Sequence, residues 1–419
     1  MAEIAPHPTA EKGTGTGRQL RTLLRAIGPA FILATVVVGP GTLTLNTIAG
    51  SSYGYTLLWV PVAATFFMII YTWMAARISL VTGKTLFQVT REKFGSRVAA
   101  IGGIFGYLAV LAFQAGNAAA VGFSANALLG MDARIWATLL CALALGLIYM
   151  PSLYGKLELL VKVVVGLMLL TFVGTLMTIG VQPEAAVRGL IPSLPDQDSI
   201  FLTIGMTATT FSIAAAVYQG YLMLEKNWGV DDMAKEGLDT IVGIGFLGFI
   251  SAVILLTSAG AIFVAGGEPV LSAEGMAAQL EPLVGPAAVY LFMAGFFFAS
   301  FSSLIVNPLI GATLLTDGLD KDSTMDGRPV KVWTTVSMAA GLLVVLIFKA
   351  PPVELIRFAQ GLAVIAFPLL GFLVMAVAGD RKIMGTHVNK PWMQGAAIIG
   401  YIAILAIVVN YIRQIASAF

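Results

Sequence analysis

The chain is a series of long apolar segments, and this feature restricts its possible folds more than any motif does. Of the 419 residues, 58% are hydrophobic and only 11% are charged, and the mean hydropathy is +0.90. Such a composition cannot cover a soluble surface, whereas a helix of about 20 apolar residues spans a bilayer. We therefore predict an all-α integral membrane protein with about eleven transmembrane helices, near residues 28–50, 54–80, 98–129, 134–151, 154–180, 199–224, 238–265, 284–315, 332–348, 354–378 and 392–415.

The polar segments are too short to form a second domain. The longest connections between apolar segments, 182–198 and 316–331, are far below the size at which a domain folds alone. The first residues are polar, rich in Pro, Gly and Thr, and without a cleavable signal pattern. We predict a disordered cytoplasmic tail at 1–25, followed by a single transmembrane transporter domain at 26–419.

Groups that could hold a cofactor or perform catalysis are scarce. The single cysteine, Cys141, lies in an apolar segment and leaves no intramolecular disulfide to form. His7 and His387 both fall in polar connections, which argues against a histidine-built metal centre. The sequence also shows no grouping of nucleophile, base and acid. We expect no enzymatic activity, no cofactor and no nucleic-acid partner.

The distribution of basic residues predicts the orientation in the membrane. With the N-terminus inside the cell, most Lys and Arg residues, for example Lys84, Arg91 and Lys93, fall in cytoplasmic connections. The connection at 266–281 would then be external, and it contains acidic residues but no basic one. An odd number of spans places the C-terminus outside. We predict a multi-pass protein of the cell membrane with a cytoplasmic N-terminus.

Helix breakers occur inside the first apolar segment, as Gly39-Pro40-Gly41-Thr42. An interrupted helix at membrane depth exposes backbone groups that lipid cannot satisfy, so the break must face protein or a watery cavity. A run of small and hydroxyl-bearing residues, 207–216, occupies the middle of the sixth segment. Breaks in helices one and six are typical of an inverted five-plus-five repeat, here about 26–181 and 199–378 with an extra helix at about 392–415.

Four segments resemble the Nramp family of proton-coupled divalent-metal transporters. They are "GPAFILATVVVGPGTLTLNTIAGSSYGYTLLWVPVAATFFMIIYTWMAARISLVTGKTL" from Gly28, "YGKLELLVKVVVGLM" from Tyr154, "FMAGFFFASFSSLIVNPLIGATLLTDG" from Phe292 and "FAQGLAVIAFPLLGFLVMAVAGDRKIMG" from Phe358. The resemblance extends over nearly the whole chain. It implies a LeuT-like fold, in which helices one and six are unwound at mid-membrane and bind the cargo.

The chain departs from the family at the ligand positions. The family's first-helix signature, Asp-Pro-Gly-Asn, falls on Gly39, Pro40, Gly41 and Thr42, so both metal-binding side chains are replaced. The sixth-helix signature, Met-Pro-His, falls on the apolar run 213–215, and the family's helix-three acids fall near Gly116 and Ala119. The glutamine of helix ten is retained as Gln360.

What remains along the expected pathway is neutral. Between residues 28 and 50, 98 and 131, and 199 and 224 the sequence contains no Asp, Glu, His or Cys. A dehydrated Mn²⁺ or Fe²⁺ ion needs anionic or soft ligands, whereas Mg²⁺ gives up water reluctantly and can be held through its hydration shell. We assign no metal ligand and expect the binding region to comprise Gly39, Pro40, Gly41, Thr42, Gln114, Asn117, Thr210, Ile213, Ala214, Ala215, Tyr218 and Gln360.

Three functions are compatible with these residues. The first is secondary transport of a divalent cation, Mg²⁺-like and largely hydrated, without the proton coupling that the family obtains from its acids. The second is transport of a small organic or neutral solute through an enlarged, neutralised site. The third is a non-transporting receptor or sensor with the same fold. In each case the expected partners are the lipid bilayer and a small solute or ion, and the sequence predicts no oligomeric state.

Overall fold

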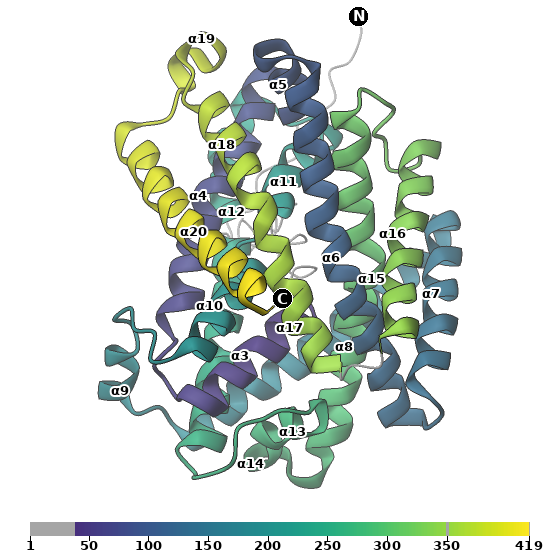
Figure 1. Ribbon diagram of the computed structural model, residues 1–419, viewed down its shortest axis with the longest axis vertical. Helices are drawn as coiled ribbons and strands as arrows, with labels where there is room; N and C mark the ends of the chain where they lie inside the picture. Colours follow the sequence, from purple (N-terminus) through teal and green to yellow (C-terminus); the bar gives the residue numbers. More distant parts are fainter. Residues whose placement is uncertain (1–37, 349–351, 419) are drawn as a thin grey trace, which may run out of the picture.

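The computed structural model describes residues 38–348 and 352–418 (Figure 1). The predicted disordered tail at 1–25 and the first part of the predicted helix 28–50 lie outside these residues. Within them all regular secondary structure is helical, and no strand occurs.

The fold consists of α-helices, which shorter 3₁₀ or π turns join or interrupt. In chain order the α-helices are α3 (Pro40–Tyr53), α4 (Trp59–Thr82), α5 (Leu86–Phe94), α6 (Ser96–Leu129), α7 (Ala133–Tyr149), α8 (Pro151–Ile179), α9 (Pro183–Arg188), α10 (Gln197–Thr210), α11 (Ile213–Glu225), α12 (Met233–Ser258), α13 (Ala273–Ala277), α14 (Glu281–Val284), α15 (Ala288–Gly318), α16 (Arg328–Ile347), α17 (Pro352–Ala363), α18 (Phe367–Ala378), α19 (Arg381–Met384) and α20 (Pro391–Ala418). The other turns are η1 (Val230–Asp232), η2 (Ala259–Phe263, π-helical), η3 (Ala278–Leu280), η4 (Gly285–Ala287), η5 (Val364–Ala366) and η6 (Gly385–His387).

Each of the eleven predicted apolar segments coincides with a helix in the described part of the chain. Eight helical stretches are long and apolar enough to cross a membrane. Two shorter apolar helices, Ala133–Tyr149 and Val163–Ile179, match the fourth and fifth segments, and α3 matches the second half of the first. The lengths of the apolar segments therefore predicted the positions and order of the membrane segments.

The tenth predicted segment, 354–378, is not one regular helix. It consists of α17 and α18 with the 3₁₀ turn η5 between them. Pro368, at the start of α18, lacks the N–H that would bond the carbonyl of Val364 four residues earlier. The helix therefore tightens into a 3₁₀ turn at Val364, close to the level of the other two breaks.

Helices α6 and α15 form the most extensively packed pair among the described helices and run side by side (Figure 1). Glycines make their close approach possible. A Cβ atom at Gly103 of α6 would lie 2.7 Å from the carbonyl oxygen of Leu314 and 2.9 Å from Cα of Gly318, both in α15. Small residues at such crossings let helix backbones meet directly, which is the usual way that membrane helices gain packing energy.

Substitution of Gly103 by alanine should destabilise the protein, because the added methyl group would collide with backbone that cannot move aside. We expect Gly103→Ala to lower the free energy of unfolding by about 1–3 kcal/mol, measured by thermal or chemical denaturation in detergent. Gly146→Ala in α7 is the matched control, since a Cβ there meets no atom within 4 Å. Equal stability of the two variants would contradict close packing at Gly103.

Candidate functional site

A small cavity lies where the broken helices meet α6, α15 and α17. It has a volume of about 30 Å³, and a buried water needs roughly 10–15 Å³, so it has room for about two water molecules. Its walls combine backbone at the break before α3 with neutral polar side chains. The lining residues are Gly39, Pro40, Gly41, Thr42, Phe113, Asn117, Thr209, Ser212, Ser303, Asn307 and Gln360.

The first break supplies one wall. Gly39 is extended, with φ −103° and ψ −172°, and α3 begins at Pro40. A proline fits the first helical position because its missing N–H would have no helical acceptor there. No side chain caps this end of α3. The described part of the first helix therefore begins at Pro40, directly after the extended Gly39, and the residues at this point line the cavity.

The second break separates α10 from α11. Only Phe211 and Ser212 are non-helical, and the Ser212 hydroxyl accepts a hydrogen bond from the N–H of Ala215, at 3.4 Å, to cap α11. The N–H of Phe211 still donates to the carbonyl of Thr207 at 2.7 Å, and the regular helical pattern of α10 ends there. Helix α11 thus begins with a serine cap, whereas α3 begins with a proline that needs no cap acceptor for its own nitrogen.

Helices α3 and α10 are joined where α3 ends and α10 begins. Asp196 begins α10, where its carboxylate accepts from the N–H of Ser199 at 2.7 Å and from the Tyr53 hydroxyl of α3 at 2.7 Å. The Ser199 N–H, followed by the Tyr53 hydroxyl, holds the pKa of Asp196 below its usual range. The carboxylate therefore stays ionised and fixes α10 relative to α3.

Gln360, near the end of α17, reaches across to the first break. Gly41 has no side chain, and a Cβ atom built there would overlap the Gln360 amide and lie 2.8 Å from Cγ2 of Thr209. Gln360 is 5% exposed, and its Oε1 atom has no hydrogen-bond partner among the described residues. An amide oxygen left without a donor in a buried site is costly, so this atom is a ready acceptor for a ligand or its water.

Asn117 of α6 is positioned by a chain of contacts that starts in α15. Pro308 lies inside α15 and cannot donate to the carbonyl of Leu304, one turn earlier. The side chain of Gln114 takes over this role, with Nε2 donating to Leu304 O at 3.1 Å. Gln114 Oε1 then accepts from Asn117 Nδ2 at 2.9 Å. This fixes which way the Asn117 amide points.

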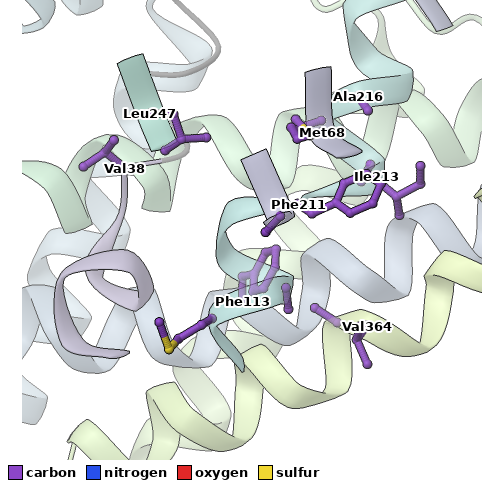
Figure 2. Packing of buried hydrophobic residues seen from close by; sticks show 14 of the residues in the cluster. Val38, Met68, Phe113, Phe211, Ile213, Ala216, Leu247 and Val364 are labelled. Atoms are coloured by element: carbon purple, nitrogen blue, oxygen red, sulfur yellow. The ribbon is translucent and has the colours of Figure 1, made fainter. Parts of the chain in front are cut away.

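Aromatic rings close the site on the side of α18. Phe211 packs edge-on against Phe367, with ring centroids 4.8 Å apart, and Tyr71 contacts both rings. Figure 2 shows Phe113 and Phe211 close together, with Ile213 and Val364 beside them. These side chains enclose a second, apolar space of about 10 Å³ that Ile213 and Ala214 also line.

The structure brings together half of the residues expected at the site. Gly39, Pro40, Gly41, Thr42, Asn117 and Gln360 line the cavity, and Gln114 supports it from behind. Ile213 and Ala214 line only the apolar space, and neither space is lined by Thr210, Ala215 or Tyr218. The lining residues outside the predicted set are Phe113, Thr209, Ser212, Ser303 and Asn307. Ser303 and Asn307 stand four residues apart on one face of α15, a spacing that the sequence displays.

The electrostatic character of the cavity is close to neutral. None of the residues lining it is Asp, Glu, His, Cys or Met. Among the described residues no three His, Cys, Asp or Glu side chains are grouped to hold a metal ion. The carboxyl end of α10 presents partial negative charge, while the amino ends of α3 and α11 present partial positive charge. The site therefore suits an ion that retains water, or a neutral polar molecule.

Comparison with known proteins assigns nearly the whole chain to one family. The family model described as "Natural resistance-associated macrophage protein-like" matches residues 30–414. The chain belongs to the Nramp family. It is accordingly a multi-pass membrane protein, and the resemblance inferred from the sequence is confirmed.

Two curated relatives of similar length carry the same name. The chain is 29% identical over 410 residues to the divalent metal cation transporter MntH of Yersinia enterocolitica, covering 94% of each chain. It is also 29% identical over 402 residues to the protein of that name from Pectobacterium carotovorum, covering 92% of each.

Solved structures confirm the fold. The chain is similar to the manganese transporter of Eremococcus coleocola in complex with an aromatic bis-isothiourea substituted compound, with a TM-score of 0.76, 16% identity, and coverage of 97% of this chain and 89% of that one. It is also similar to MhsT in complex with L-phenylalanine, with a TM-score of 0.62, 15% identity, and coverage of 91% and 98%. The Nramp chain thus has the expected LeuT-like fold, and its sixth predicted segment is interrupted between α10 and α11.

The contact between Gln114 and Leu304 can be tested by a double-mutant cycle. In the wild-type protein, Gln114→Leu leaves the Leu304 carbonyl unpaired, which should cost about 1–3 kcal/mol of unfolding free energy. Pro308→Ala restores a backbone donor to that carbonyl, so Gln114→Leu should cost markedly less in this background. Denaturation in detergent measures both effects. Additive effects of the two substitutions would show that Gln114 does not replace the missing N–H.

Proposed function

We propose that this protein is a secondary transporter of divalent metal cations, with the cavity between the two breaks as its binding site. The observation that carries the proposal is the buried Gln360 oxygen, which lies without a donor beside Gly41. The printed names of the relatives, divalent metal cation transporter, support the cargo class. The neutral lining of the cavity then determines which divalent cation it can bind.

The favoured cargo is a Mg²⁺-like ion that keeps part of its hydration shell. Neutral amide and hydroxyl oxygens cannot replace all the water of a transition-metal ion, and no soft sulfur ligand lines the cavity. Mg²⁺ retains several waters when it binds, and those waters donate outward to acceptors such as the Gln360 oxygen. In the arrangement described here the cavity holds only about two waters, so binding of an ion with several retained waters requires this space to widen.

The same site lacks the family's groups for proton coupling. The helix-three positions that match its acids are Gly116 and Ala119, both buried. A Cβ atom at Gly116 would lie 3.4 Å from Cα of Ile356 and 3.8 Å from Cβ of Ala359, so α17 occupies the space next to Gly116. We therefore propose that protons do not move through helix three in this protein.

The topology of the proposed transporter follows the distribution of charge. One transmembrane domain with a cytoplasmic N-terminus and an external C-terminus keeps most basic residues inside the cell. The acidic connection that contains α13 and α14 would then face outward, at the lower end of Figure 1.

A neutral polar solute is the second candidate, because a divalent ion in a site without a carboxylate bears a large desolvation cost. The lining of amides and hydroxyls favours this alternative. The small volume opposes it, since about 30 Å³ accepts no organic molecule of more than a few atoms in the arrangement described here. A sensor would bind the same ligand without moving it.

Uptake of Mg²⁺ into proteoliposomes tests the proposal. We expect the wild-type protein to take up Mg²⁺, followed with an internal fluorescent indicator, and Gln360→Leu to weaken uptake roughly 10- to 100-fold through loss of one buried acceptor. Gln182→Leu, in an exposed connection, is the matched control.

The paired variant Gly39→Asp with Thr42→Asn restores the family's ligand types and should add Mn²⁺ uptake. If the wild-type protein moved neither Mg²⁺ nor Mn²⁺ while this variant moved Mn²⁺, a neutral solute would become the better assignment. Binding of Mg²⁺ by the wild-type protein without uptake would instead indicate a sensor.

A further inference from the structure

The polar cavity and the apolar space beside it share two lining residues, Phe113 of α6 and Ser212 of the second break. Every other lining residue borders one of the two spaces only. The Ser212 hydroxyl is held by its bond from the N–H of Ala215. The Phe113 ring is therefore the larger part of the partition, and it has unfilled volume on both of its sides.

The two spaces follow one another along the helix bundle. On α6 the cavity is lined by Asn117 and the apolar space by Ala109, and Phe113 lies about one turn from each. Along α17 and η5, which run in the opposite direction, Gln360 lines the cavity and residues 363–364 line the apolar space (Figure 1). Both segments therefore place the apolar space toward the face of the protein at which α6 begins and α18 ends.

The apolar space offers little to water or to an ion. Ser212 supplies the single polar side chain among its lining residues, and this hydroxyl already caps α11. The volume of about 10 Å³ admits one water at most, and a buried water needs about two to four polar partners. The space is therefore dry, and a cation that entered it would lose the oxygens of the cavity at a high desolvation cost.

Three aromatic rings continue this barrier beyond the apolar space. Phe211 and Phe367 both line the space, and the Tyr71 ring contacts them with centroid distances of 5.2 and 5.3 Å. The Tyr71 hydroxyl donates to the carbonyl oxygen of Ala397 at 3.0 Å, which ties these rings to α20. They are fixed by one another, whereas Phe113 borders unfilled volume. Phe113 is thus the ring of the barrier that has room to turn.

We propose that the apolar space is the first part of the route by which cargo leaves the cavity toward the face where α6 begins, and that the Phe113 ring is the barrier to this route. With the ring as described, the route is dry and an ion stays in the cavity. Rotation of the ring joins the two spaces and enlarges the volume available to a hydrated ion. Phe113 therefore limits the size of the cargo that passes. Only the identity of that cargo rests on the proposed function.

The accessibility of a single cysteine tests the barrier without any cargo. Cys141 is the one cysteine of the sequence, so Cys141→Ser combined with Thr209→Cys leaves one thiol, in the wall of the cavity. Membrane vesicles of each orientation are exposed to Ag⁺, and the thiol that remains free is counted with a maleimide after denaturation. In the same Cys141→Ser background, Arg97→Cys marks the face at which α6 begins, because Arg97 is exposed there.

Phe113→Ala should raise the rate of the Ag⁺ reaction at position 209 by roughly 10-fold or more from the face at which α6 begins, because the barrier is removed. The rate from the opposite face should not change. Phe292→Ala in α15 is the matched control and should change neither rate, since Phe292 is also an interior ring but lines neither space. An unchanged rate in Phe113→Ala, or an equal rise from both faces, would overturn the proposal.

A second variant keeps the test decisive if Phe113→Ala does not fold. Phe113→Leu leaves a smaller opening and should raise the rate less, from the same face; a rate equal to that of the wild-type ring would contradict the barrier. If the labelling behaves as expected but the wild-type protein takes up no Mg²⁺, the proposed cargo fails while the route stands. Uptake of Mg²⁺ with labelling that ignores Phe113 would remove the route and leave the cargo.

Discussion

Inside a membrane every backbone polar group needs a partner within the protein, and in this molecule one such group organises the site. Pro308 deprives the Leu304 carbonyl of its helical donor, and Gln114 of α6 supplies the missing hydrogen bond at 3.1 Å. The same glutamine then orients Asn117 toward the cavity. The hydrogen bond that α15 lacks at Pro308 thereby determines the direction of the Asn117 side chain on α6.

The cavity lies where the start of α3 at Pro40 meets the break between α10 and α11, which Ser212 caps. Amide and hydroxyl groups stand in place of charged and soft ligands, and Gln360 fills the space that the missing Gly41 side chain leaves. Neutral groups of this kind hold an ion mainly through its water, which lowers affinity and makes release easier.

The sequence was sufficient to predict the membrane helices, because apolar length is a local property, while the fold was implied by the resemblance to the Nramp family. Gln360 and Asn117 line the cavity, whereas Thr210 and Tyr218 do not. Ser303 and Asn307 were missed, since only the packing of α15 on α6 shows which of its faces is turned inward.

The hydrogen bond of Gln114 shows a second limit of prediction from the sequence. The sequence analysis expected Gln114 in the binding region, whereas the structure places it behind the cavity, bonded to α15. The identity of the partner depends on Pro308, nearly two hundred residues later in the chain. Such long-range pairings follow from the three-dimensional arrangement and have no local signature.

The contact between Gly103 and Gly318 has a mechanical consequence. Because α6 and α15 meet with no space for even a methyl group, neither helix can slide or turn against the other without separating their backbones. Asn117, Ser303 and Asn307 project from this pair and form a fixed wall of the cavity. The opposite wall, from Gly39 to Thr42 and around Ser212, is made by helix ends and extended backbone instead. Any widening of the cavity by backbone movement must therefore come from those segments, because the wall on α6 and α15 cannot open without parting the two helices.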